Sequence, residues 1–148
     1  MKRAAAFAAI GLAMLLAAGC GGDKKDESEG GALNKEAVAA CNGSALSETP
    51  NLPPSWPQIE SDKMVYTKEE KKGPTTVVEG HFNGDLQDAY DEWKKELEAS
   101  GYKILFDEIE EHDSEVSWEG EGRSGQVALR EECGESDKIY VHITNRPA

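Results

Sequence analysis

The sequence holds few of the residues on which metal centres, redox sites and nucleic-acid surfaces depend. There are 3 cysteines and 3 histidines among 148 residues, and lysine and arginine total 16 against 29 aspartates and glutamates. The resulting net charge of −13 repels the phosphate backbone of nucleic acids, so we exclude a nucleic-acid partner. No apolar run reaches the roughly 20 residues that a helix needs to cross a bilayer. No Gly-x-Ser-x-Gly nucleophile motif is present either.

The start of the chain departs from this polar composition. Lys2-Arg3 is followed by an apolar stretch over residues 4–16, by small residues at 17–19, and then by Cys20. A positive start, a short apolar segment and small residues are together typical of an export signal. We therefore predict that residues 1–19 are a signal peptide and that the protein is exported.

Ala17-Ala18-Gly19-Cys20 resembles the lipobox of bacterial lipoproteins, in which a small residue precedes a cysteine. The resemblance implies cleavage after Gly19, acylation of Cys20, and a lipid anchor on the extracytoplasmic face of the cell membrane. The family prefers leucine three residues before the cysteine, where this chain has Ala17. An ordinary secretory signal with an incidental cysteine is the alternative. Lys2-Arg3 carries the only charges before Cys20, so the mature chain would have a net charge of −15.

The other two cysteines are expected to form a disulfide. An odd cysteine count in an exported protein indicates that one cysteine has a separate role, and the lipid anchor supplies that role for Cys20. Cys41 and Cys133 then remain as a pair outside the reducing cytoplasm. A bridge closing so long a loop stabilises the fold by about 4–5 kcal/mol on the chain-entropy model. Two separate buried thiols are the alternative.

A polar tether is expected between the anchor and a single domain. Residues 21–31 contain no apolar side chain, so they cannot bury surface to offset the entropy of ordering. We assign residues 20–32 to the lipidated cysteine and a flexible tether. Residues 33–148 are long enough for one domain with one core.

The domain is predicted to begin with a short helix and a proline-rich arm. Asn34 is a suitable N-cap for a helix over residues 35–41. Four prolines between Pro50 and Pro57 exclude helix and sheet interior, which leaves an extended arm. We expect Trp56 to pin this arm to its own domain. The alternative is that the arm is a peptide ligand for an aromatic groove.

Two strands and one long helix are predicted next. Residues 64–69 and 75–82 are strand-like and should form a hairpin. From Leu86 to Ser100, apolar residues recur at spacings of three and four, which is typical of an amphipathic helix. Asp85 should cap this helix and Gly101 should end it.

Alternating apolar residues predict about four further strands. The alternating sets are Tyr102, Ile104 and Phe106; Val116 and Trp118; Val127 and Leu129; and Ile139, Val141 and Ile143. We therefore expect an α+β fold, in which one long helix packs on one face of an antiparallel sheet of five to six strands. The expected order is ββαββββ, after the short helix and the arm.

No motif predicts a catalytic, metal or cofactor site. Gly120-x-Gly122-x-x-Gly125 matches the dinucleotide fingerprint as a string, but a strand follows where a helix is needed, so we interpret it as a hairpin tip. His81 and His142 are expected on the outer face of the sheet, where they could hold a metal with a glutamate. Surface histidine is the simpler interpretation for both, and also for His112. The acidic run over 107–115 lacks the ligand spacing of an EF-hand calcium loop, so we interpret it as a solvated sheet edge.

The order of anchor, tether, proline arm and compact domain resembles that of many small bacterial envelope lipoproteins. The features shared with them are the arm near Trp56-Pro57 and an aromatic helix leading into Gly101-Tyr102. This resemblance implies an architecture and no activity. We predict a non-enzymatic binding or structural module of the cell envelope, with an envelope protein or the cell wall as its partner. The alternatives are a divalent-cation-binding lipoprotein that uses the acidic edge and the histidines, and a small hydrolase.

Overall fold

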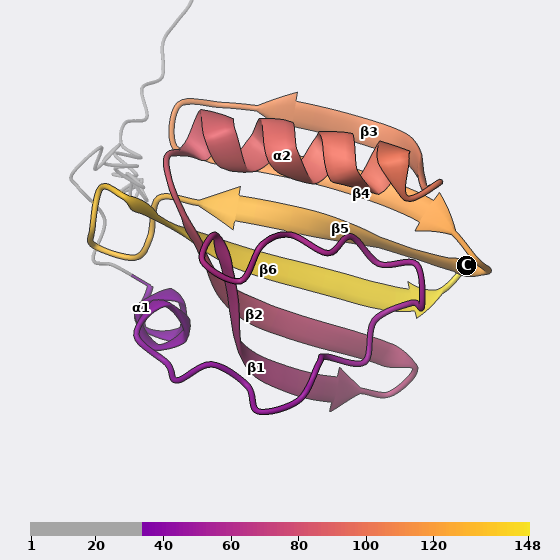
Figure 1. Ribbon diagram of the computed structural model, residues 1–148, viewed down its shortest axis with the longest axis horizontal. Helices are drawn as coiled ribbons and strands as arrows, with labels where there is room; N and C mark the ends of the chain where they lie inside the picture. The colour runs from indigo at the N-terminus through magenta and orange to yellow at the C-terminus, as the bar shows by residue number, and fades with distance from the viewer. Residues whose placement is uncertain (1–33) are drawn as a thin grey trace, which may run out of the picture. The chain divides into compact units, whose positions relative to one another are not determined.

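The computed structural model describes residues 34–148, which form an α+β domain with two helices and one antiparallel sheet of six strands (Figure 1). This confirms the predicted fold class. The elements are α1 (Lys35–Cys41), β1 (Met64–Lys72), β2 (Thr75–Asn83), α2 (Leu86–Ala99), β3 (Lys103–Ile109), β4 (Asp113–Gly120), β5 (Arg123–Arg130) and β6 (Lys138–Pro147). The predicted signal peptide, the anchor Cys20 and the tether 20–32 lie outside the described residues.

The last strand of the chain lies in the middle of the sheet. The strand order is β1-β2-β6-β5-β4-β3, so β6 pairs with β2 on one side and with β5 on the other. Every second residue of β6 points to the same face, and Ile139, Val141 and Ile143 are buried there. The sheet ends at β1 on one edge and at β3 on the other.

Helix α2 packs against β3, β4 and β5. The Asp85 carboxylate accepts a hydrogen bond from the backbone N–H of Asp88 at 2.8 Å, and Gly101 follows the helix end with φ +88°, so the predicted cap and stop are confirmed. The buried stripe of the helix consists of Leu86, Ala89, Trp93 and Leu97. With 14 residues, α2 has an ordinary length rather than the long one expected, because the chain turns back at Gly101 to enter β3. Neither helix within residues 34–148 has the length and apolar character needed to span a membrane.

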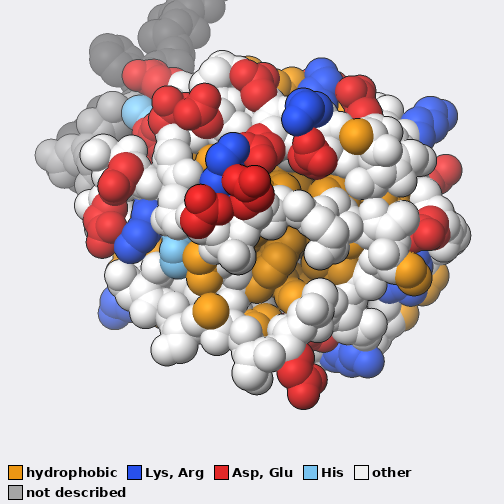
Figure 2. All heavy atoms as spheres, in the orientation of Figure 1, with side chains coloured by type: hydrophobic (Ala, Val, Ile, Leu, Met, Phe, Trp, Pro, Cys, Tyr) orange, Lys and Arg blue, Asp and Glu red, His pale blue; other side chains and the backbone are white. Residues whose placement is uncertain are grey.

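The proline-rich arm lies on the same face of the sheet as α2 (Figure 1). Trp56 is 4 % exposed, and its ring centroid lies 5.8 Å from those of Trp93 and Tyr102 and 5.0 Å from that of Trp118. Its indole N–H donates to the Tyr66 hydroxyl at 3.3 Å. The prediction that Trp56 pins the arm to its own domain is therefore confirmed. Figure 2 shows the hydrophobic side chains that gather near the centre of this face.

Helix α1 covers part of the opposite face. Ile139 and Val141 belong to the main core with α2, whereas Tyr140 between them packs with Ala37, Ala40 and both domain cysteines in a second cluster. Alternate residues of a strand point to opposite faces, so the two helices lie on opposite sides of the sheet. Cys41 and Cys133 form a disulfide, which joins the end of α1 to the segment between β5 and β6.

Candidate functional site

The histidines expected on an outer sheet face lie in different environments. His81 is only 8 % exposed, so the expectation of a surface histidine is wrong for this residue; it pairs in register with Tyr140, on the face that α1 covers. Burial lowers the pKa of His81, and the nearby Lys138 charge lowers it further. His142 is partly buried, which lowers its pKa, and its Nδ1 lies 3.2 Å from the Tyr140 hydroxyl. His112 is exposed, and its pKa is raised by its contact with Glu131.

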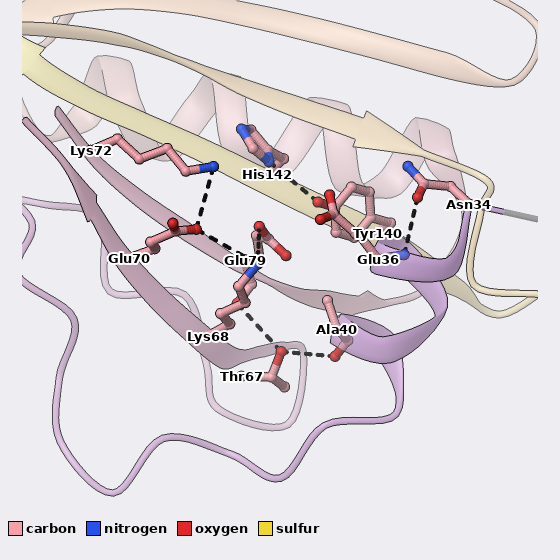
Figure 3. Close-up of polar contacts among 10 residues, drawn as sticks. All are labelled: Asn34, Glu36, Ala40, Thr67, Lys68, Glu70, Lys72, Glu79, Tyr140 and His142. Carbon is pink, nitrogen blue, oxygen red and sulfur yellow. Dashed lines mark hydrogen bonds and ion pairs between the residues drawn. The ribbon is translucent and has the colours of Figure 1, made fainter.

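Glu79 is a buried carboxylate that the sequence analysis did not single out. It is 3 % exposed and stands in register between Lys68 of β1 and His142 of β6 (Figure 3). Its Oε1 accepts a hydrogen bond from Lys68 Nζ at 2.9 Å, and this contact raises the pKa of the lysine. Its Oε2 is buried without a hydrogen-bond partner in the described part of the chain. Its signal in the sequence is its position as the one acidic residue in the strand-like segment 75–82.

The ion pair borders a small pocket between α1 and the edge of the sheet. The pocket has a volume of about 310 Å³ and is lined by Glu36, Ala39, Ala40, Thr67, Lys68 and Glu79. The Thr67 hydroxyl donates to the Ala40 carbonyl at 2.8 Å and so ties the end of α1 to β1. Among residues 34–148, no group of three or more histidine, cysteine, aspartate or glutamate side chains is placed to hold a metal ion.

The glycine-rich string forms the turn between β4 and β5, as expected. Glu121 and Gly122 have φ values of 53° and 70°, the left-handed conformation of a tight turn. The Glu121 carboxylate accepts a hydrogen bond from the Tyr102 hydroxyl at 3.0 Å, and that hydroxyl accepts one from Ser55 Oγ at 3.0 Å. The turn thus fastens the arm to the sheet, a role that the sequence string did not indicate.

Within the acidic run over 107–115, Asp107 contacts helix α2, whereas several other residues are exposed. Asp107 accepts hydrogen bonds from Lys94 Nζ at 2.7 Å and from the Tyr90 hydroxyl, both on α2. The hydrogen bond from Lys94 is the main cause that lowers the pKa of the Asp107 carboxyl, and the hydrogen bond from Tyr90 lowers it further. Glu108, Glu110 and Glu111 are exposed to solvent. The interpretation of a solvated edge therefore does not fit Asp107, which contacts the helix.

A β-bulge in β3 changes the direction of its side chains. Ile104 pairs with Trp118 and Phe106 pairs with the next residue, Ser117, so Leu105 is an extra residue in the strand. After the bulge, Phe106 lies on the face opposite Ile104, which corrects the expectation that both point into the core. Leu105 and Phe106 are each 51 % exposed and Ile109 is 38 % exposed. These are the exposed large hydrophobic residues of the described chain, and all of them belong to β3.

The two edges of the sheet differ in what lies beside them. Along β1, the backbone N–H of Leu46 donates to the Tyr66 carbonyl at 2.8 Å, and the N–H of Asn51 donates to the Glu69 carboxylate at 3.1 Å. The segment before β1 therefore runs beside this edge. Within residues 34–148, β3 pairs with β4 alone, so its outer edge has no partner strand.

Comparisons of the chain with protein-family models, with curated proteins and with solved structures found no match.

Proposed function

We propose that this chain is a lipid-anchored lipoprotein of the extracytoplasmic membrane face, and that its domain is a non-enzymatic binding module of the cell envelope. The pairing of Cys41 with Cys133 is the observation that supports this most directly. Disulfides persist outside the reducing cytoplasm. The pairing also uses two of the three cysteines, which leaves Cys20, at the end of the lipobox-like segment, for acylation.

Phase partition in the detergent Triton X-114 tests the anchor. The full chain is produced in a bacterial host together with Cys20→Ala and with the matched control Cys41→Ala. We expect the unaltered chain and the control to enter the detergent phase in processed form, and Cys20→Ala to remain unprocessed. Equal processing and equal partition of all three chains would contradict lipid anchoring through Cys20.

The binding role is supported by the part of the sheet that neither the helices nor the arm cover. The arm is held by Trp56, and α2 lies beside it on the same sheet face, so neither the arm nor that face is free to take a partner. The opposite face is covered by α1 only over β1, β2 and β6. The uncovered remainder includes the β3 edge, where the exposed apolar residues Leu105 and Phe106 lie. We place the partner there.

The cation-binding and hydrolase alternatives stay predictions. Calorimetric titration of the chain with calcium and zinc tests the first, with His81→Ala, His142→Ala as the comparison. Micromolar binding that is lost in this variant would favour the cation-binding role over a role limited to protein or cell-wall partners.

A further inference from the structure

Three features that depart from a regular, solvent-exposed strand coincide on β3. It exposes two adjacent large hydrophobic residues, Leu105 and Phe106; it carries a bulge; and it pairs Glu108 directly opposite Glu115 of β4. Like charges placed opposite each other on neighbouring strands destabilise a sheet. Natural sequences depart from such local rules mainly at functional sites, so their coincidence on one strand indicates a function.

The bulge is held in place by contacts with the helix. The Asp107 carboxylate binds Lys94 and Tyr90 of α2, which fixes Asp107 on the α2 face of the sheet. Side chains alternate along a strand, so this contact keeps the neighbouring Phe106 on the opposite face. Since the Asp107 contact fixes the register, the outward direction of Phe106 is built into the fold.

The charge around the exposed pair is mostly negative. We define the β3 surface as Leu105, Phe106, Glu108, Glu115 and Glu119. The register places Phe106 beside Ser117, Glu108 beside Glu115 and Lys103 beside Glu119, all on the same face. Lys103 is the one basic residue of β3 and β4, and the Glu115 carboxylate has only the neutral Gln126 amide as a hydrogen-bond partner, at 2.7 Å.

We propose that the β3 surface binds a basic, extended protein segment, which adds as a strand to the open edge and carries an apolar side chain and a lysine or arginine two positions apart, on the same face. The unpaired backbone groups of β3 would bond the main chain of the segment. Its apolar side chains would cover Leu105 and Phe106, and its cations would neutralise Glu108 and Glu115. A second copy of this chain is disfavoured as the occupant, because its net charge of −13 and its own acidic edge repel the same surface. This proposal rests on the binding role proposed above.

Peptide titration of the mature chain in detergent tests the proposal. The probes are a nine-residue peptide in which valine and lysine alternate at every second position with threonine between them, a matched peptide with glutamate in place of lysine, and a peptide of the same composition in which valine and lysine are segregated to opposite faces of the strand. We expect saturable binding of the alternating basic peptide, together with slower hydrogen exchange of the β3 amides. The other two peptides should bind at least tenfold more weakly. Raising the salt concentration should weaken binding further, because the attraction between exposed charges is screened.

Variants locate the binding surface. Phe106→Ser and the pair Glu108→Gln, Glu115→Gln should each reduce affinity for the alternating basic peptide at least tenfold. Glu98→Gln, an exposed change on α2, should leave it unaltered. An unchanged melting temperature of Phe106→Ser shows that the variant is folded. Equal binding of acidic and basic peptides, unaltered affinity in these variants, or binding without added protection of β3 would overturn the proposal.

Two further results would assign β3 to another occupant and so overturn the proposal. One is a concentration-dependent dimer of the mature chain that Phe106→Ser dissociates. The other is binding of the Cys20→Ala chain to phospholipid vesicles that Phe106→Ser abolishes. Peptide binding in detergent does not depend on the anchor, so failure of the anchor and failure of this proposal are distinguishable.

Discussion

Reducing the Cys41–Cys133 bridge should lower the stability of the domain by about 4–5 kcal/mol. The two cysteines are separated by 92 positions, and closing a loop of that size removes this much chain entropy from the unfolded state at 25 °C. Helix α1 has 7 residues, too few to be stable without tertiary support, so it should be the first element to lose its structure. For about 115 ordered residues, the same free energy corresponds to a fall in melting temperature of about 15–20 °C.

Urea unfolding followed by tryptophan fluorescence measures this loss. Trp56, Trp93 and Trp118 are all buried in one cluster, so their emission should change strongly when the core opens. The mature chain is unfolded with and without a phosphine reductant, beside the control variant Cys41→Ala, Cys133→Ala, whose midpoint should not respond to reductant.

Two results would refute this reasoning. The first is coincident midpoints for the oxidised and the fully reduced chain. The second is thiol labelling of both Cys41 and Cys133 in the unreduced, urea-unfolded protein, which would show that the pair is not oxidised.

Three further predictions concern the bulge, the two histidines with lowered pKa values and one close backbone contact. In urea titrations, Phe106→Ser should change the free energy of unfolding by less than about 0.5 kcal/mol. Trp56→Ala, by comparison, should lower it by about 3–5 kcal/mol. A large loss of stability in Phe106→Ser would contradict the outward position of this ring. His81 and His142 have lowered pKa values in the folded state, so their side chains bind protons more readily in the unfolded chain. The stability that these neutral histidines contribute should therefore be fully present above pH 6.5 and be lost as the pH falls below it, which urea titration at several pH values measures. Substituting both by glutamine should flatten that fall, and an unaltered slope would refute its assignment to these residues. Gly125→Ala should lower the melting temperature strongly, since its Cβ would clash with the backbone carbonyl oxygen of Thr144 in β6. An unchanged melting temperature would contradict this packing.

Local signals in the sequence were sufficient for the elements whose ends are set by single residues. Asn34 and Asp85 cap their helices through side-chain hydrogen bonds to the backbone, and Gly101 takes the left-handed conformation after α2. The count of three cysteines predicted that Cys41 and Cys133 pair, because the predicted lipid anchor would use Cys20. Each of these inferences depends on a few neighbouring residues or on a count.

Features set by contacts distant in the chain could not be predicted. The bulge at Leu105 depends on the Asp107 contacts with α2, and the period of two in the sequence favoured an inward Phe106 instead. The burial of His81 and Glu79 depends on α1, which crosses a face that the strand pattern left open. The candidate surface on β3 was therefore visible in the sequence only as an acidic run.

Mass spectrometry of the N-terminal peptide is the most direct test of the proposed lipoprotein. The full chain is produced in a bacterial host, extracted from membranes and digested, and the peptide that begins at residue 20 is sought. We predict that residues 1–19 are absent and that Cys20 carries the added mass of fatty acyl groups. A retained signal segment, or a mature N-terminus with an unmodified Cys20, would contradict a lipid-anchored protein.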